Sequence, residues 1–390
     1  MEYIGGKILG KGSYGCVFRP ALSCKETKTK KKTLNTISKI YFHRDGIKEA
    51  EIEFNINSQI KKIKNHSKWA SIFTTKCKPK NYEELLKEDD EIAKCKMLEH
   101  SENLIMLQGN YGGVDIDNYI TDQLITSYQH DLLRSNMEPF IAKYNTFLLK
   151  FKNVLKGLCD MNKHNICHMD IKYENLVINN NVIKLIDFGL SNNSKSDFHT
   201  INKRAYSELR NINRYYHPYP PEFIYSCTYS DYYTIMNKEL ELIRGGNFRE
   251  NFNTLKELHE KMIKDVKHMD KYIINLIKRN LDNPLSDVEK KKLYDKIDIY
   301  SLGYIFIYIF NIMNEYENIV NNVFIDIIND PIINPFIELC GKMLQLNYYD
   351  RISAEDAYKE YCIIYDFFTK KKKKKNMQKQ KHKRKKSRRK

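Results

Sequence analysis

The stretch "HMDIKYENLVINNNVIKLIDFG", residues 168–189, decides how the rest of the chain is interpreted. It places Asp170, Asn175 and Asp187 at fixed offsets, two of them beside short apolar runs that are typical of strands. The runs "NLVI" and "VIKLID" are separated by "NNN", a composition that favours a tight turn between two paired strands. The pattern therefore predicts a hairpin flanked by acidic and amide side chains.

Length and composition are those of a folded protein. A chain of 390 residues can form one large domain or two moderate ones, and its apolar content of 42% is ordinary for a globular protein. The opening residues "MEYIGGKILG" lack a basic region followed by an apolar one, so we expect no signal peptide. The longest apolar run, "YSLGYIFIYIF" from Tyr300, is shorter than the roughly 18 residues of a membrane span. It predicts a buried core helix, and we expect no membrane association.

The nine cysteines are scattered along the chain, and none of them forms a Cys-x-x-Cys pair. Neither a zinc site nor a disulfide framework is indicated by this spacing. We therefore expect free thiols in a reducing, intracellular compartment.

Positive charge is concentrated at the C-terminus. The net charge is +17, but residues 370–390 carry 15 Lys and Arg and no acidic residue, which leaves about +2 for everything before them. Such a segment has no apolar face to bury, so residues 369–390 are expected to be a disordered basic tail. The tail is either simply solvated or a tether for nuclear import, nucleic acid or an acidic partner.

Periodicity divides the chain into a strand-rich beginning and a helical remainder. "YIGGKILGKGSYGCVFRPAL" and "LNTISKIYF" are extended runs, and "GIKEAEIEFNINSQIKKI" has helical spacing. After about residue 117 the pattern is mainly helical, with a charged helical insert at about 225–295. We predict an α+β chain with a small part at 1–109, a connection at 110–116 and a larger helical part at 117–368.

The glycines of "LGKGSYGCVF" have a spacing that suits a phosphate group. Gly10, Gly12 and Gly15 follow the G-x-G-x-x-G pattern, with Val17 after them, between two strand-like runs. A dinucleotide-binding loop would instead open a helix and be followed by an acidic residue about 20 positions later. A glycine-rich hairpin lets backbone N–H groups approach a phosphate, and Val17 can cover a purine ring. An ordinary tight turn is the alternative.

A lysine within an extended run is the next candidate. Lys39, in "TISKI", is flanked by apolar residues, so its burial is costly unless it meets a negative group. Alternatively it lies on an edge strand and extends its ammonium to water. The following helix offers Glu53 as its partner and Glu49, one turn earlier, as a rival, while a solvated helix face is the alternative for both.

Taken together, these segments resemble eukaryotic-type protein kinases. "HMDIKYENLVI" is similar to their catalytic loop H-x-D-x-x-x-x-N, and "DFG" to their metal-binding triplet. "YPPEF" looks like the motif that closes the activation segment, "DKIDIYSLG" like the helix carrying Asp298, and Arg351 like the late arginine that pairs with Glu222. The resemblance covers about residues 3–368, apart from the insert, and implies the bilobal kinase fold.

The resemblance implies a serine/threonine kinase that uses ATP and Mg²⁺. In such an enzyme the protein aligns the alcohol and neutralises charge on the transferred phosphoryl group. The implied roles are a proton acceptor, Asp170; metal ligands, Asn175 and Asp187; phosphate contacts, Lys39 held by Glu53, and Lys172, which also goes with Ser/Thr substrates; and a nucleotide site formed by Gly10, Gly12, Ser13, Gly15, Val17, Lys39, Asn110, Tyr111 and Gly112.

Three positions depart from the family pattern or leave its register open. Met169 replaces the usual arginine that reads a phosphate on the activation segment, so we expect activity without that phosphorylation. Available phosphorylation sites are Ser191, Ser194, Ser196 and Thr200. Ser38 is assigned to the position that usually holds alanine beneath the adenine. Either Gln108 or Gly109 guards the rear of the pocket, and glycine there would leave an open back pocket; a simple interlobe turn is the alternative at 110–112.

The remaining features leave several functions open. The insert at 225–295 is either extra solvated helices or a dock for a partner. The 28 tyrosines, together with abundant Asn, Ile and Lys, fit an AT-rich genome, and with "GGKILGKGSYGCVF" they resemble kinases of large DNA viruses. A nuclear or virion-associated location is compatible with that likeness. The alternatives to an active kinase acting on proteins are a catalytically dead ATP-binding scaffold and a nucleic-acid-tethered protein that acts through its tail. The sequence does not determine the oligomeric state.

Overall fold

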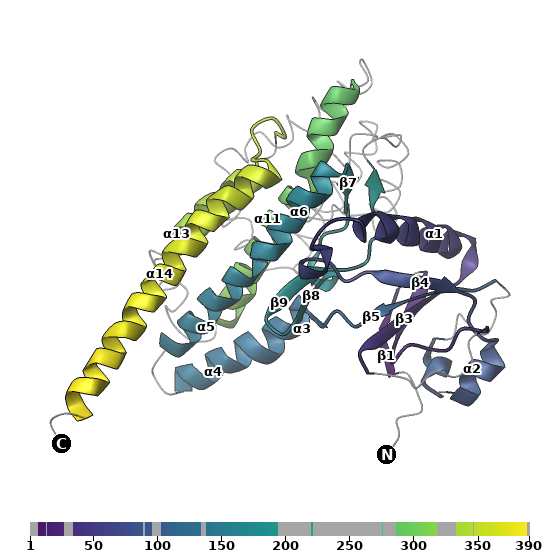
Figure 1. Ribbon diagram of the computed structural model, residues 1–390, viewed down its shortest axis with the longest axis horizontal. Helices are drawn as coiled ribbons and strands as arrows, with labels where there is room; N and C mark the ends of the chain where they lie inside the picture. The colour runs from purple at the N-terminus through teal and green to yellow at the C-terminus, as the bar shows by residue number, and fades with distance from the viewer. Residues whose placement is uncertain are drawn as a thin grey trace, which may run out of the picture. The chain divides into compact units, whose positions relative to one another are not determined.

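The computed structural model describes most of the chain in two compact units. The described residues are 7–12, 14–26, 34–88, 90–95, 103–133, 138–193, 220, 275, 286–317, 333–345 and 347–387. The first unit combines Met1–Tyr119 with Lys163–Ser196, and the second combines Ile120–Asn162 with Asp197–Lys390 (Figure 1). The segment 168–189 thus belongs to the same unit as the N-terminal sheet, although the sequence assigns it to the larger helical part.

An antiparallel sheet of five strands forms the centre of the first unit. Its strands are β1 (Lys7–Lys11), β2 (Gly15–Arg19), β3 (Thr36–Tyr41), β4 (Phe73–Cys77) and β5 (Ile105–Asn110). They lie in the order β1-β2-β3-β5-β4. Helix α1 (His43–Ile60) packs against β3, β4 and β5 and confirms the helical spacing of the sequence (Figure 1).

The two faces of this sheet bury different sets of side chains, because successive side chains of a strand point to opposite faces. Tyr41 and Leu107 pack with Ala50 of α1 on what we call the inner face. Ile40 and Met106 belong instead to a larger apolar cluster on the outer face. Residues of the segments 85–95 and 16–24 contribute to the same outer cluster.

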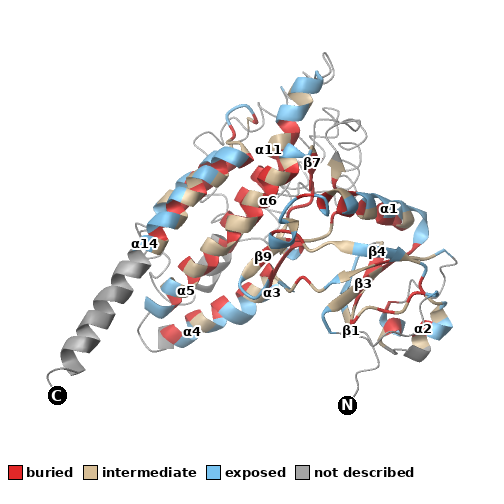
Figure 2. Cartoon of the chain, in the orientation of Figure 1, coloured by how far each residue is buried: buried red, intermediate tan, exposed pale blue. Residues whose placement is uncertain are grey.

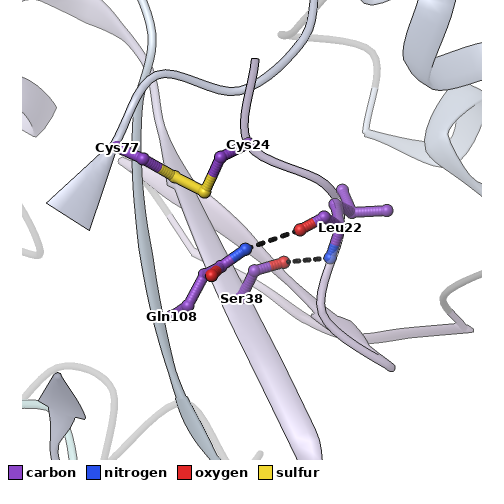
Figure 3. Close-up of a disulfide and its surroundings, with 5 residues drawn as sticks. All are labelled: Leu22, Cys24, Ser38, Cys77 and Gln108. Atoms are coloured by element: carbon purple, nitrogen blue, oxygen red, sulfur yellow. Dashed lines mark hydrogen bonds between the residues drawn. A yellow bond between two sulfur atoms is a disulfide. The ribbon is translucent and has the colours of Figure 1, made fainter. Parts of the chain in front are cut away.

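Two disulfides close the outer cluster, so the expectation of free thiols was wrong for four cysteines. Cys16 is bonded to Cys95. Cys24 is bonded to Cys77, as Figure 3 shows. The strand register shows where Cys16 and Cys77 lie. The pairs Cys16↔Ile40, Ile40↔Met106 and Met106↔Cys77 form one row across the sheet. A cysteine therefore stands at each end of a row that spans four strands. Free thiols are present at Cys159, Cys167, Cys340 and Cys362.

The predicted hairpin at 176–185 is confirmed. Strands β8 (Leu176–Asn179) and β9 (Val182–Leu185) pair antiparallel, and β6 (Val114–Asp115) adds a third strand. Asn180 and Asn181 join β8 to β9 with φ of 47° and 64°, left-handed values that asparagine tolerates in such turns. The remaining elements of the first unit are α2 (Tyr82–Glu88), α3 (Ile116–Tyr119), β7 (Ile166–Cys167), β10 (Asn192–Asn193) and three short 3-10 turns, His66–Lys68, Asp90–Lys94 and Tyr173–Asn175.

The described part of the second unit is helical. It contains a π-helical turn (Ile120–Ile125), a 3-10 turn (Leu149–Phe151), α4 (Thr126–Leu133), α5 (Glu138–Leu148), α6 (Lys152–Lys163, whose last residue belongs to the first unit), α11 (Asp287–Glu317), α13 (Asn334–Met343) and α14 (Ala354–Ser387). Rings from different helices pack edge to face, including Phe151 on Phe306 and Phe336 on Tyr361. The apolar run from Tyr300 lies in α11 and is largely buried, as predicted (Figure 2). None of the helices in the described ranges has an apolar stretch long enough to cross a membrane.

Two sequence expectations about the C-terminal half have different outcomes. The basic segment from residue 370, expected to be disordered, continues α14 as helix to Ser387. Lys, Arg and Gln favour helix, and the packed first turns of α14 remove the cost of nucleation. The predicted partner of Arg351, Glu222, lies outside the described residues, as does most of the insert. Arg351 itself is buried and donates to the carbonyls of Gln345 and Lys296.

Reducing the two disulfides should destabilise the first unit. The bonds join residues 79 and 53 positions apart, and cross-links over loops of that size contribute about 2–4 kcal/mol each to the free energy of unfolding. We expect dithiothreitol to lower the melting temperature of the oxidised protein, and peptide mapping without reductant to recover the two linked pairs. The variant with Ser at all four positions should melt at the same temperature with or without dithiothreitol. An equal response of both proteins to the reductant would contradict the assignment.

Candidate active site

Lys39 lies at the centre of a cluster of carboxylates from three separate segments. Its Nζ is 2.9 Å from Asp187 Oδ1, 3.5 Å from Glu53 Oε2 and 3.6 Å from Glu49 Oε1. Burial disfavours the ammonium, but the nearby anions outweigh it and raise the pKa of Lys39 well above its usual value. The two glutamates that the sequence offered as rivals therefore both contact the same lysine.

Glu53 is held by more than its ion pair. Its carboxylate is 1% exposed and accepts a hydrogen bond from the backbone N–H of Phe188 at 3.2 Å. The hydroxyl of Tyr41 donates to the same carboxylate. Burial raises the pKa of Glu53 to about 7, against the opposing attraction of Lys39. Tyr41 did not emerge from the sequence, where a tyrosine ending a strand looks like an ordinary core residue.

The segment that follows β7 forms a compact network of hydrogen bonds. Asn175 donates from Nδ2 to the carbonyl of Asp170 at 2.9 Å and to its carboxylate Oδ2 at 2.8 Å. Lys172 Nζ lies 3.0 Å from the same Oδ2. Burial opposes the charge of Lys172, but Asp170, Glu174 and Asp187 outweigh it and raise the pKa of Lys172. Lys172 is thus paired with the carboxylate that Asn175 also binds.

His168 and Ser191 hold the backbone next to this network through hydrogen bonds to carbonyl groups. The Nε2 atom of His168 is 3.0 Å from the carbonyl of Ile186, and its ring packs on Phe188 with centroids 4.8 Å apart. Ser191 is buried and donates its hydroxyl to the carbonyl of His168 at 3.1 Å. The sequence counted Ser191 among the accessible phosphorylation sites, and the structure contradicts this. Ser194, Ser196 and Thr200 lie outside the described residues.

Asp187 and Asn175 offer oxygen atoms that suit Mg²⁺. Asp187 has a left-handed φ of 60°, and its side chain is 39% exposed. Burial alone would raise its pKa, but Lys39 outweighs burial and lowers it, so the carboxylate is ionised. Both bonds of Asn175 use its amide nitrogen, which leaves the amide oxygen for a cation. Carboxylate and amide oxygens are hard ligands of the kind Mg²⁺ takes. The described residues contain no group of three or more His, Cys, Asp or Glu arranged to hold a metal ion.

The glycine-rich hairpin is placed beside Lys39. The N–H of Gly12 donates to the carbonyl of Gly15 at 2.8 Å, and Val17 pairs directly with Lys39 across β2 and β3. A Cβ on Gly15 would lie 2.5 Å from the carbonyl oxygen of Ile40, so only glycine allows this approach of β2 to β3. Gly10 lies in β1, and Ser13 lies outside the described residues.

The predicted hinge residues are partly engaged within the first unit. The N–H of Tyr111 donates to Asn35 at 2.7 Å, and the carbonyl of Asn110 accepts from the hydroxyl of Ser71 at 3.1 Å. A Cβ on Gly112 would lie 2.8 Å from Cγ2 of Val177. Val177 therefore lies directly against the hinge, a position that the sequence analysis did not identify.

The structure resolves the register at the rear of the site. Leu107 packs on the inner face with Lys39 opposite it in the register, so Gly109 is also on that face. Gln108 points outward, where its Nε2 donates to the carbonyl of Leu22 at 2.7 Å (Figure 3). A Cβ on Gly109 would lie 2.6 Å from the carbonyl oxygen of Ile72. Backbone atoms of Ile72 and Phe73 therefore lie directly beside the glycine, and the open back pocket stays a prediction.

Ser38 also points outward, so its assignment beneath the adenine was wrong. It is fully buried in the outer face, and its hydroxyl accepts a hydrogen bond from the N–H of Leu22 at 3.0 Å (Figure 3). The residue that shares the inner face with Lys39 is Ile37, which pairs with Gly109. Ser38 is one residue before Lys39 and therefore points to the opposite face, whereas Ile37 is two residues before Lys39 and shares its face.

A comparison with protein families agrees with this geometry. The model of the protein kinase domain matches residues 3–233, more than half of the chain. The chain belongs to the protein kinase family. The strand-rich sheet and the helical second unit agree with the two-lobed kinase fold predicted from the sequence.

Similar kinases include mitogen-activated protein kinase 5 of Oryza sativa subsp. japonica and mitogen-activated protein kinases 3 and 4 of Arabidopsis thaliana. They are 36%, 36% and 37% identical to this kinase-family chain over 86 residues. The matched stretch covers 22% of this chain and 22% of each relative, so the likeness spans about a fifth of the length of these relatives.

Substituting Gly109 should destabilise the kinase fold. Gly109→Ala would force the backbone at Ile72 to shift, a clash that costs about 1–3 kcal/mol in a packed site. Gly10→Ala is the matched control, because a Cβ there meets nothing within 4 Å. Chemical denaturation of both variants measures the difference. Equal stability of the two variants would show that the backbone at Ile72 yields freely.

Proposed function

We propose that this protein is a serine/threonine kinase that transfers the γ-phosphoryl group of ATP to hydroxyl groups of proteins. One observation carries the proposal: Lys39 bridges Glu53 and Asp187 within the unit that also holds the bonded pair Asp170 and Asn175. Phosphoryl transfer needs a positioned cation, metal ligands and a carboxylate near the alcohol, and these residue types supply all three.

Two groups of residues would hold the nucleotide, one at its phosphates and one at its adenine. Lys39 would contact the α and β phosphates, and the backbone of the loop with Gly10, Gly12, Ser13 and Gly15 would approach them closely. Val17 and the hinge at Asn110, Tyr111 and Gly112 would hold the adenine. Because Tyr111 already donates its N–H to Asn35, the backbone of Gly112 is the better candidate for the adenine.

Mg²⁺, held by Asp187 and Asn175, would neutralise charge on the phosphates. Asp170 would orient the substrate hydroxyl and accept its proton. Asn175 would help to fix its orientation, because its amide donates one hydrogen bond to the carboxylate of Asp170 and one to the backbone carbonyl of the same residue. Lys172, beside Asp170, would stabilise the transferred phosphoryl group. A lysine two residues after the catalytic aspartate supports serine and threonine as substrates.

Activity would not require phosphorylation of the activation segment. Met169 is apolar and buried where an arginine would read a phosphate, so the loop offers no guanidinium at this position. The buried hydroxyl of Ser191 donates to the carbonyl of His168, so the start of the activation segment is joined to the catalytic loop by a direct hydrogen bond.

Removing the proposed proton acceptor should abolish phosphoryl transfer. We expect Asp170→Asn to lower kcat by about 100-fold or more, since a positioned general base contributes about 10² to 10⁴ in rate. The assay measures label transfer from Mg-ATP to a protein mixture, followed by phosphoamino-acid analysis, which should yield phosphoserine and phosphothreonine. Asp366→Asn, an exposed carboxylate on α14, is the matched control and should leave kcat unchanged. An Asp170→Asn variant as active as the control would refute the proposal, and phosphotyrosine as the sole product would refute the substrate class.

The hydroxyl groups of Ser194, Ser196 and Thr200 should be dispensable. The triple variant Ser194→Ala, Ser196→Ala, Thr200→Ala should keep kcat within about twofold of the wild type. Position 169 holds methionine, so no arginine there can bind a phosphate on the activation segment. Ser191 is left intact, since its hydroxyl is buried in a hydrogen bond. Treating the wild type with a phosphatase gives an independent measurement, and a tenfold loss of kcat in either experiment would contradict independence from phosphorylation.

A further inference from the structure

Tyr41 is the third residue of β3, after Ile37 and Lys39, that points to the inner face of the sheet. Its side chain is fully buried against Ala50 of α1 and Leu107 of β5. The ring lies beneath the ammonium of Lys39, with 4.7 Å between Nζ and the ring centre. Its hydroxyl reaches past the lysine to the carboxylate of Glu53. One strand thus presents both a cation and a hydrogen-bond donor to the same buried carboxylate.

The ion pair alone does not select Glu53 over Glu49. Lys39 Nζ lies at nearly equal distances from the two carboxylates, 3.5 Å and 3.6 Å, and it lies closer to Asp187. A lysine ammonium is a compact charge with little directional preference, so it can exchange between these acceptors. The position of Glu53 therefore depends on donors with a fixed direction.

Two such donors act on Glu53. The N–H of Phe188 binds Oε1, and the hydroxyl of Tyr41 binds Oε2, the oxygen that also faces Lys39. The two donors bind different oxygens of the carboxylate, and one comes from the backbone after Asp187 and the other from β3. With both oxygens occupied, the carboxylate plane is fixed and a rotation away from Lys39 breaks a buried hydrogen bond.

We propose that Tyr41 is a positioning residue for phosphoryl transfer, whose hydroxyl fixes the carboxylate of Glu53 toward Lys39. This inference rests on the proposed function, because it assigns Tyr41 a part in holding the lysine that contacts the phosphates. Burial raises the pKa of Tyr41 well above its usual value, so its hydroxyl keeps its proton and acts as a donor. If Tyr41 only filled the core, phenylalanine at position 41 would serve equally well.

The first test compares Tyr41→Phe with Tyr361→Phe. Both variants delete one buried tyrosine hydroxyl that donates a hydrogen bond, but Tyr361 donates to the carbonyl of Leu148 in the second unit. We expect Tyr41→Phe to lower kcat about tenfold while KM for ATP changes less than twofold, because losing a hydrogen bond to a charged group that acts mainly in the transition state lowers kcat. Tyr361→Phe should leave both constants within twofold of the wild type. Expressing kcat per molecule that binds nucleotide corrects for any unfolded fraction.

The second test asks whether Tyr41 acts through Glu53. In a Glu53→Gln background the carboxylate that the hydroxyl fixes is absent, so adding Tyr41→Phe should change kcat by less than twofold. A tenfold loss in both backgrounds would show that Tyr41 acts independently of Glu53 and would overturn the inference. So would an unchanged kcat in Tyr41→Phe when the wild type is active. A wild type without Asp170-dependent transfer would refute the proposed function and the role of Tyr41 with it.

Discussion

The buried ammonium of Lys39 is the interaction on which the rest of the first unit depends. It joins β3 to α1 through Glu53 and Glu49, and to the segment after β9 through Asp187. Three carboxylates around one ammonium are stable only if hydrogen bonds satisfy the excess negative charge, because a buried charge without partners is costly. The hydroxyl of Tyr41 and the N–H of Phe188 serve this purpose at Glu53. Each element that meets at Lys39 is thus held by the others.

The outer face of the sheet stabilises the same strand from the opposite side. Ser38 and Ile40 alternate with Ile37, Lys39 and Tyr41, so every second residue of β3 points to the outer face, where Ile40 joins the outer cluster. There Ser38 and Gln108 bind the N–H and the carbonyl of Leu22, and the disulfide from Cys24 to Cys77 fixes the same segment to β4 (Figure 3). The backbone that carries Lys39 is therefore immobilised by side chains that take no part in the chemistry.

The sequence predicted what lies within contiguous motifs and missed what depends on register. The hairpin around Asn180 and α1 follow from local spacing. The hydrogen bonds between Asn175 and Asp170 and the contact of Lys39 with Asp187 were not predicted, because they join side chains that the motifs name only by their separate roles. The disulfides could not be predicted, because the bonded cysteines are 79 and 53 residues apart and each bond joins a strand cysteine, Cys16 or Cys77, to a cysteine outside the strands. Ser38 was misread because a shift of one residue moves a side chain to the other face. The segment 65–100 carries β4 and α2 without a clear period, and neither element was predicted.

The alternation of side chains along the strands also explains which residues near the proposed nucleotide site are large and which are small. The family usually carries a small residue near the catalytic lysine on the site-facing side of β3, whereas this chain has Ile37 on that side. The residue paired with it on β5 is Gly109, and the backbone at Ile72 approaches that glycine closely. A larger residue at 109 would have to displace the backbone of Ile72 and Phe73, so backbone atoms rather than a side chain limit the space opposite Ile37. Val17 lies on the same face, opposite Lys39, so the residues that line the proposed nucleotide site follow from which positions of β2, β3 and β5 fall on the inner face.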